Sequence, residues 1–153
     1  MLLGDEAIAQ GFIDAGGSAI NSYPGTPSTQ ITEYVINSKQ AKELGVIANW
    51  CANEKTALEA SIGVAYAGKR AMTCMKHVGL NVCGDPFMNA AIIGTKGVLV
   101  VVAHVLHAGH GAFAGVGHAD RGLKGRLLVS APVGDHAEFL SLLRVNDILC
   151  DLG

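Results

Sequence analysis

Short apolar segments alternate with segments that carry helix signals along the first hundred residues of the chain. The apolar segments are SAINSY (18–23), VIANW (46–50), RAMTCM (70–75) and GVLVVVA (97–103). The helical segments are 5–15, about 26–38, 53–68 and a further one that begins at Asp85–Pro86. This alternation is typical of an α/β fold, in which helices cover both faces of a mostly parallel sheet. We therefore predict a three-layer α/β sandwich with about five or six strands, built as a single domain over residues 1–153.

Start and stop signals predict where the helices end. Thr26 followed by Pro27 has the form of an N-cap followed by a first-turn proline. Asn53 is the expected N-cap of the longest helix, and Gly68 is its expected stop. The stretch 76–84 between the third strand and the next helix is expected to be a loop.

The segment 104–125 differs in character from the rest of the chain, because it is rich in Gly, Ala and His and has no clear periodicity. Order is expected to return with a strand near 126–130 and a helix near 135–148. Five potential zinc ligands lie in or beside this segment: His104, His107, His110, His118 and Asp120. Successive histidines at this spacing point in different directions around a helix, and the intervening glycines disfavour a rigid one. We therefore predict no metal site.

Composition and charge narrow the function classes. Thirteen acidic and eleven basic residues give a net charge of −2 without a Lys/Arg cluster, which disfavours nucleic-acid binding. The four cysteines form no CxxC pair, a pattern typical of reduced thiols in a cytosol. The start of the sequence lacks the basic region of a signal peptide, and the most apolar run, 98–105, is too short to span a bilayer. We predict a cytoplasmic protein without a membrane partner. An apolar content of 50% also fits a surface that partner subunits cover.

Three loops are expected to meet at one edge of the sheet. Right-handed crossovers place the connections that follow parallel strands outside the carboxyl ends of those strands, where α/β proteins bind ligands. The loops are 24–28, 51–54 and 76–85. The candidate functional residues therefore belong to these loops.

The loop YPGTPS suits a cofactor cradle. Gly25 permits close backbone approach, and Pro24 and Pro27 stiffen the loop. Neither GxGxxG nor GxxxxGK[ST] is present, so the loop matches neither nucleotide motif. The alternative is structural, with Thr26 acting only as a helix cap.

Charged side chains at the same edge admit two interpretations each. Glu54 lies in the first turn of a helix, where the helix dipole favours a carboxylate for structural reasons alone. Held in an apolar crevice, the same carboxyl group would share a proton with a ligand nitrogen. Glu59, five residues on, is expected to face solvent or pack against a neighbour. Lys76 and His77 suit an anionic substrate carboxylate, or are ordinary solvated loop residues.

Several motifs in order resemble one known family. They are GDEAIAQG, YPGTPSTQI, NEKTALEASIG, AGKRAMTCMKHVGLNV and DPF. Together they resemble the N-terminal, pyrimidine-binding domain of the alpha subunit of indolepyruvate ferredoxin oxidoreductase, a thiamine-diphosphate-dependent 2-oxoacid ferredoxin oxidoreductase. The resemblance extends from the start of the chain to about Ala103.

The resemblance implies an activity and a set of site residues. The expected reaction is oxidative decarboxylation of an arylpyruvate to an aryl-acetyl coenzyme A, with ferredoxin as electron acceptor. Glu54 takes the place of the glutamate that hydrogen-bonds a ring nitrogen of the cofactor's aminopyrimidine, and Thr26 that of a catalytic residue near the reacting centre that hydrogen-bonds the 2-oxoacid. Further cofactor-binding positions are Tyr23, Pro24 and Gly25, and further substrate-binding positions are Lys76, His77 and Asn81.

The chain departs from the family's pattern in two respects. It lacks the GDG…N motif and the cysteine clusters that bind the diphosphate–Mg²⁺ end and the iron–sulfur clusters. The resemblance therefore implies a diphosphate-binding domain or subunit, a beta or gamma subunit and ferredoxin as partners, a dimeric assembly, and an isolated chain without activity. The segment 104–125 is also atypical of the family. Alternative functions are a truncated or non-catalytic fragment that keeps the fold for subunit assembly, and a small-molecule or metal-binding α/β module.

Overall fold

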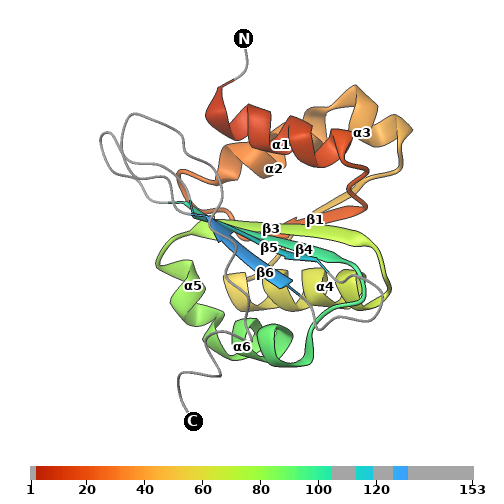
Figure 1. Ribbon diagram of the computed structural model, residues 1–153. Helices are drawn as coiled ribbons and strands as arrows, with labels where there is room; N and C mark the ends of the chain where they lie inside the picture. Colours follow the sequence, from red (N-terminus) through yellow and green to blue (C-terminus); the bar gives the residue numbers. More distant parts are fainter. Residues whose placement is uncertain (1–2, 105–112, 119–125, 131–153) are drawn as a thin grey trace.

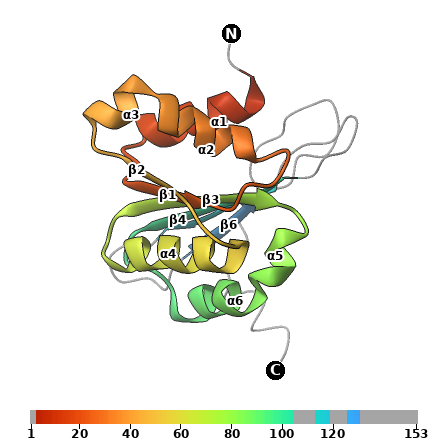
Figure 2. The ribbon, with the colours of Figure 1, turned by 180° about the vertical axis from the view of Figure 1, so that it is seen from behind.

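A six-stranded sheet separates two layers of helices in the computed structural model, which describes residues 3–104, 113–118 and 126–130 (Figure 1). The strands are β1 Ala19–Ser22, β2 Ile47–Trp50, β3 Arg70–Lys76, β4 Val98–His104, β5 Phe113–His118 and β6 Arg126–Ser130. One helical layer contains α1 Gly4–Asp14, α2 Thr29–Asn37 and α3 Lys39–Glu43, and the other contains α4 Glu54–Tyr66, α5 Gly79–Val82 and α6 Gly84–Ile93 (Figures 1 and 2). The predicted three-layer α/β sandwich is confirmed.

The sheet is mostly parallel, as predicted. Its strand order is β2-β1-β3-β4-β5-β6, and β1, β2, β3 and β4 run parallel to one another. The pairings of β4 with β5 and of β5 with β6 are antiparallel. A parallel crossover needs about a dozen residues or more, and the sequence between His104 and Phe113 is shorter than that. The predicted strand near 126–130 is β6, whereas the predicted helix near 135–148 lies outside the described residues.

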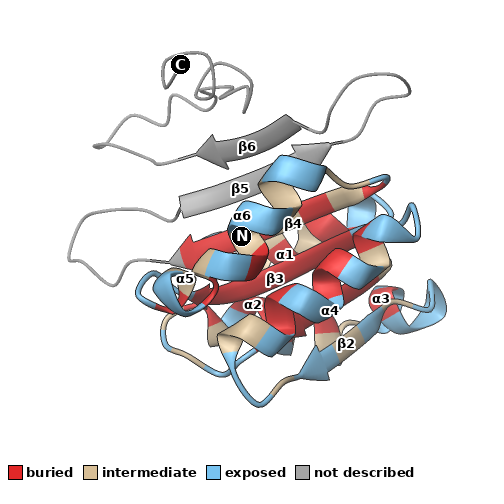
Figure 3. Cartoon of the chain, turned by 90° about the horizontal axis from the view of Figure 1, so that it is seen from below, coloured by how far each residue is buried: buried red, intermediate tan, exposed pale blue. Residues whose placement is uncertain are grey.

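Apolar side chains on both faces of the parallel strands form two cores. Met72 of β3 faces α1 and α2, where it packs with Ile13, Ile20 and Ile31. Its neighbour Ala71 faces α4, in the cluster that also contains Leu58, Ile62, Met75 and Leu99. Figure 3 shows this buried zone along β3 and β4 and on the inner sides of the helices. Because both of their faces are covered, the central strands β3 and β4 are mostly apolar.

The predicted cap of the second helix was wrong. The helix begins at Thr29 after Ser28, and the Thr26–Pro27 peptide bond before it is cis. The backbone N–H of Ser28 donates to the carbonyl oxygen of Gly25 at 3.0 Å, so residues 25–28 close a turn of their own. The structural interpretation of Thr26 as an N-cap therefore fails, since Thr26 belongs to this turn.

The stretch 76–84 is more ordered than the predicted loop. It contains α5, a single helical turn that packs Cys83 into the same core as Met75. Four residues are too few to show helical periodicity in the sequence.

The predicted helix that starts at Glu54 after the Asn53 cap is confirmed. Among the residues that the structure describes, no helix has the length and apolar character needed to cross a membrane.

Gly97 marks a close backbone approach at the start of β4. A Cβ atom built there would overlap the carbonyl oxygen of Lys69 and would lie 2.7 Å from the backbone carbon of Gly68. We expect Gly97→Ala to lower the free energy of unfolding by about 1–3 kcal/mol, because backbone atoms cannot rotate away as a side chain can. Chemical denaturation of the full chain measures this. In the control Gly63→Ala the new methyl group meets nothing within 4 Å, so an equal loss in both variants would contradict the explanation.

Candidate functional site

The loops that follow β1, β2 and β3 meet at one edge of the sheet. Strand pairing aligns Ser22, the last residue of β1, with Trp50, the last residue of β2, and with Cys74 of β3, which continues to Lys76. The loop after β1 lies over the end of β3, since a Cβ atom built on Gly25 would be 3.7 Å from the Cβ atom of Lys76. The predicted convergence of the three loops is therefore confirmed.

Glu54 projects from the start of α4 towards α5. A Cβ atom built on Gly79 would lie 2.8 Å from both Cγ and Oε1 of Glu54. The Glu54 side chain is half-buried, whereas Glu59 of the same helix is exposed. The carboxyl group of Glu54 is thus held against the segment that follows β3, at the edge where the loops meet.

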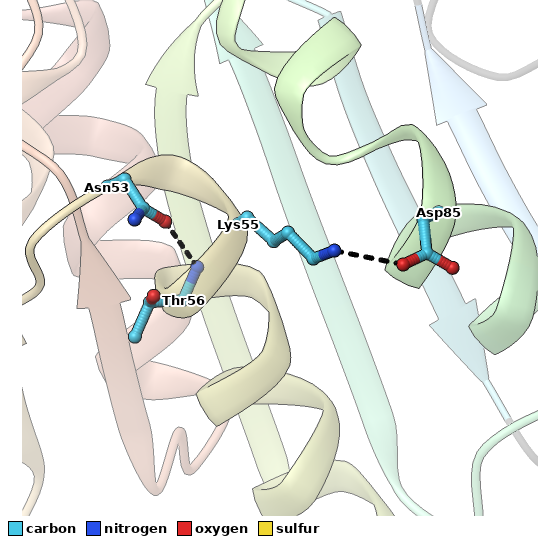
Figure 4. Close-up of polar contacts among 4 residues, drawn as sticks. All are labelled: Asn53, Lys55, Thr56 and Asp85. Carbon is cyan, nitrogen blue, oxygen red and sulfur yellow. Dashed lines mark hydrogen bonds and ion pairs between the residues drawn. The ribbon is translucent and has the colours of Figure 1, made fainter.

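The start of α4 is fixed by a side-chain cap. The Oδ1 atom of Asn53 accepts a hydrogen bond of 2.8 Å from the backbone N–H of Thr56 (Figure 4). We expect Asn53→Ala to lower the free energy of unfolding by about 1 kcal/mol, because one N–H group of the first turn loses its acceptor. Asn53→Asp is the matched control, since aspartate caps equally well. Thermal unfolding of both variants measures the effect, and an equal loss in the aspartate variant would contradict it.

A charged pair links the first turns of α4 and α6. The Nζ atom of Lys55 donates to Oδ2 of Asp85 at 2.9 Å (Figure 4). The hydrogen bond and the negative charge of Asp85 raise the pKa of Lys55. Both side chains are exposed to solvent, so the pair contributes little to the stability of the fold.

Cys83, at the end of α5, was not predicted as a site residue. Its thiol is buried, with Sγ 3.8 Å from Sδ of Met75. Burial raises the pKa of the Cys83 thiol to about 11, and the negative charge of Glu54 adds to the shift. The thiol is therefore neutral at pH 7.

A buried polar network holds α4 on the sheet. The Nδ2 atom of Asn21 donates to Oγ of Ser61 at 3.1 Å, and Nδ2 of Asn49 donates to Oδ1 of Asn21 at 3.2 Å. Ser61 in turn donates to the carbonyl oxygen of Met72 at 3.0 Å. The polar residues inside the apolar strand segments were the only sequence signal of this network. It sets the position of α4, and with it that of Glu54, relative to β1 and β3.

The predicted site residues lie at this edge with different exposure. Glu54 and Gly25 are half-buried. The others are exposed to solvent: Tyr23, Pro24, Thr26, Lys76, His77 and Asn81. The structure brings Gly25 against Lys76, and Glu54 against the segment that carries His77 and Asn81. Among the described residues, no hydrogen bond joins Thr26 to Glu54.

Two of the five potential zinc ligands lie within the described residues, on different strands. His104 and His118 belong to β4 and β5, whereas His107, His110 and Asp120 lie outside the described residues. Within the described part of the chain, no group of three or more His, Cys, Asp or Glu side chains is placed to bind a metal ion.

Comparison with known proteins gives relatives over about two thirds of the chain. The chain is 44% identical over 102 residues to indolepyruvate oxidoreductase subunit IorA of Pyrococcus horikoshii, and 44% identical over 103 residues to IorA of Archaeoglobus fulgidus. These matches cover 67% and 66% of this chain but 15% and 16% of the relatives. No family model matches the sequence.

A solved structure with the same fold belongs to a related enzyme. It is a 2-oxoglutarate:ferredoxin oxidoreductase from Magnetococcus marinus with 2-oxoglutarate, coenzyme A and succinyl-CoA bound. The TM-score is 0.62 at 26% identity, over 70% of this chain and 18% of that chain. The matched two thirds of this chain is therefore similar in sequence to one part of indolepyruvate oxidoreductase subunit IorA, and similar in fold to one part of a 2-oxoglutarate:ferredoxin oxidoreductase.

Proposed function

We propose that the chain is the aminopyrimidine-binding part of a thiamine-diphosphate-dependent oxidoreductase that oxidatively decarboxylates arylpyruvates such as indolepyruvate. The relatives' name, indolepyruvate oxidoreductase, supports the substrate, and the bound 2-oxoglutarate and coenzyme A of the structural neighbour support the reaction class. The observation that carries the proposal is the half-buried Glu54 carboxyl group held against Gly79 at the ligand edge of the sheet.

The residues at this edge fit an aminopyrimidine ring. Such a ring has apolar faces and a ring nitrogen that needs an acidic hydrogen-bond partner. Glu54 supplies the carboxyl group, while the exposed Tyr23 and Val78 supply apolar surface on the two neighbouring loops. Gly25 leaves room for close backbone approach between them.

Each side chain has a proposed task in the bound state. Thiamine diphosphate supplies an electron sink for the loss of CO₂ from the 2-oxoacid. Glu54 holds and returns a proton at the ring nitrogen of the aminopyrimidine. Thr26 donates a hydrogen bond to the 2-oxoacid, and the positive charge of Lys76 attracts its carboxylate. The substrate carboxylate and the 2-oxo oxygen would also lie near His77 and Asn81.

The proposed site needs partners. The chain spans about 15% of the length of the curated relatives it matches, so a diphosphate-binding domain or subunit would complete the cofactor site with Mg²⁺. Beta or gamma subunits with iron–sulfur clusters would pass electrons to ferredoxin in the cytoplasm. We propose a dimeric assembly without nucleic-acid or membrane partners.

One observation favours a second candidate function, a non-catalytic subunit that keeps the fold for assembly. Met88, Ile92 and Ile93 of α6 are exposed by 57%, 67% and 67%, which is typical of a face that contacts another subunit. Both candidates include a subunit contact, and only the enzymatic one requires the acid at position 54. The variant Glu54→Gln separates them.

Calorimetry tests whether the cofactor site is shared between this chain and a partner. We expect the isolated chain to bind thiamine diphosphate with Mg²⁺ no more tightly than about 1 mM, because half of the site is supplied by a partner. The complex that copurifies with the tagged chain, its subunits identified by native mass spectrometry, is expected to bind stoichiometrically. Micromolar, Mg²⁺-dependent binding by the isolated chain would contradict this arrangement.

A further inference from the structure

Gly79 forms the surface against which the Glu54 side chain lies. It is the first residue of α5 and is buried. A Cβ atom built on Gly79 would lie 2.8 Å from Cγ, 2.8 Å from Oε1 and 3.1 Å from Cδ of Glu54. Real Cβ atoms essentially never approach other heavy atoms this closely. The position of Glu54 therefore depends on the absence of a side chain at residue 79.

The backbone of α5 is held more firmly than the side chain it contacts. The N–H of Cys83 donates to the carbonyl oxygens of Gly79 at 3.3 Å and of Leu80 at 3.1 Å, and the N–H of Leu80 donates to that of His77. The buried side chain of Cys83 anchors the turn in the core. Glu54 has three side-chain torsions and is only half-buried, so it would move first in response to a clash.

Cys83 lies at the end of α5, on the same side as Gly79. Residues 79 and 83 are four apart in the chain and therefore lie on the same side of the turn. Burial raises the pKa of the Cys83 thiol, and the negative charges of Glu54 and Glu59 add to the shift. The close approach to Gly79 places the Glu54 side chain against α5.

We propose that Gly79 is a positioning residue: its missing side chain sets the place of the Glu54 carboxyl group at the ligand edge, and thereby the place where a proton-sharing ring can bind. The effect on where a ring binds rests on the proposed function, whereas the placement of the Glu54 side chain by Gly79 does not. Gly79 has no left-handed φ, so alanine is compatible with its backbone and the new methyl group is the main change.

The structural test compares Gly79→Ala with Gly84→Ala in the full chain. Both glycines begin a helix, but a Cβ atom on Gly84 meets nothing within 4 Å. In NMR spectra we expect nuclear Overhauser contacts between the γ protons of Glu54 and the α protons of Gly79 in the wild type and in Gly84→Ala. We expect their loss in Gly79→Ala. Contacts that persist in Gly79→Ala would overturn the proposal.

A double variant separates positioning from a general effect on folding. Any fall in the thermal midpoint caused by Gly79→Ala should disappear in the Glu54→Ala background, because the atoms beyond Cβ that it clashes with are then gone. An equally large fall in the thermal midpoint in that background would show that the new methyl group clashes with atoms other than those of Glu54, and would overturn the proposal.

The functional test uses the complex that copurifies with the tagged full chain, assayed for 2-oxoacid-dependent reduction of ferredoxin. We expect Gly79→Ala to lower kcat about 10²-fold with little change in KM for the 2-oxoacid, and Gly84→Ala to stay within about twofold of the wild type. Unchanged kcat in Gly79→Ala, despite the lost NMR contacts, would overturn its functional part. Full turnover in Glu54→Gln would instead refute the proposed function and leave the NMR result standing.

Discussion

Glu54→Gln is expected to lower turnover of the assembled complex by about 10²–10⁴-fold, while the chain remains folded and bound to its partners. Glutamine has nearly the shape of glutamate, so it fits the same space against Gly79. Its amide group can form a hydrogen bond with a ring nitrogen but cannot hold and return a proton. The loss should fall on kcat and kcat/KM alike, as for an interaction that matters in the transition state.

The matched control for this variant is Glu59→Gln. Glu59 belongs to the same helix but is exposed, so the same chemical change there should leave turnover within about twofold of the wild type. Native mass spectrometry of both variants checks that the complex is intact. A Glu54→Gln complex that retains half or more of the wild-type rate would reject the catalytic role and favour the assembly function.

Leu58→Ala is expected to lower the free energy of unfolding by about 2–5 kcal/mol. Leu58 is 0% exposed and lies about one turn after Glu54, in the core between α4 and the sheet. Its truncation would leave a cavity beside Met75 and Ile62, which belong to the same buried cluster. Chemical denaturation measures the loss as a lower midpoint at an unchanged m-value.

Leu44→Ala is the control for this core variant. Leu44 is 60% exposed at the end of α3, so the same truncation should change the free energy of unfolding by no more than about 0.5 kcal/mol. Similar losses in the two variants would contradict the placement of the core beneath α4.

The architecture could be predicted because helix and strand signals agreed over the first hundred residues. Asn53 combined a capping residue with a long amphipathic segment, and the cap is present. The Thr26–Pro27 signal was equally strong locally, but there the chain first closes a turn onto Gly25 and begins α2 at Thr29. Local sequence propensity does not determine which of these two backbone paths the folded chain takes.

The place of Glu54 in the fold was predictable for the same reason. The cap and the strand order put Glu54 at the edge of the sheet where the loops after β1, β2 and β3 meet. The importance of Gly79 depends on how closely α5 approaches α4, and no local pattern encodes that distance. The network of Asn21, Asn49 and Ser61 likewise joins residues far apart in the sequence. Its members were visible only as polar residues in apolar surroundings.

The most direct measurement is an experimental structure of the partner complex with thiamine diphosphate and Mg²⁺ bound. We predict that a carboxylate oxygen of Glu54 lies about 2.7–3.2 Å from a ring nitrogen of the aminopyrimidine, with Gly79 still packed against the Glu54 side chain. Thiamine diphosphate bound away from this edge, or its aminopyrimidine paired with a different acid, would contradict the role assigned to Glu54.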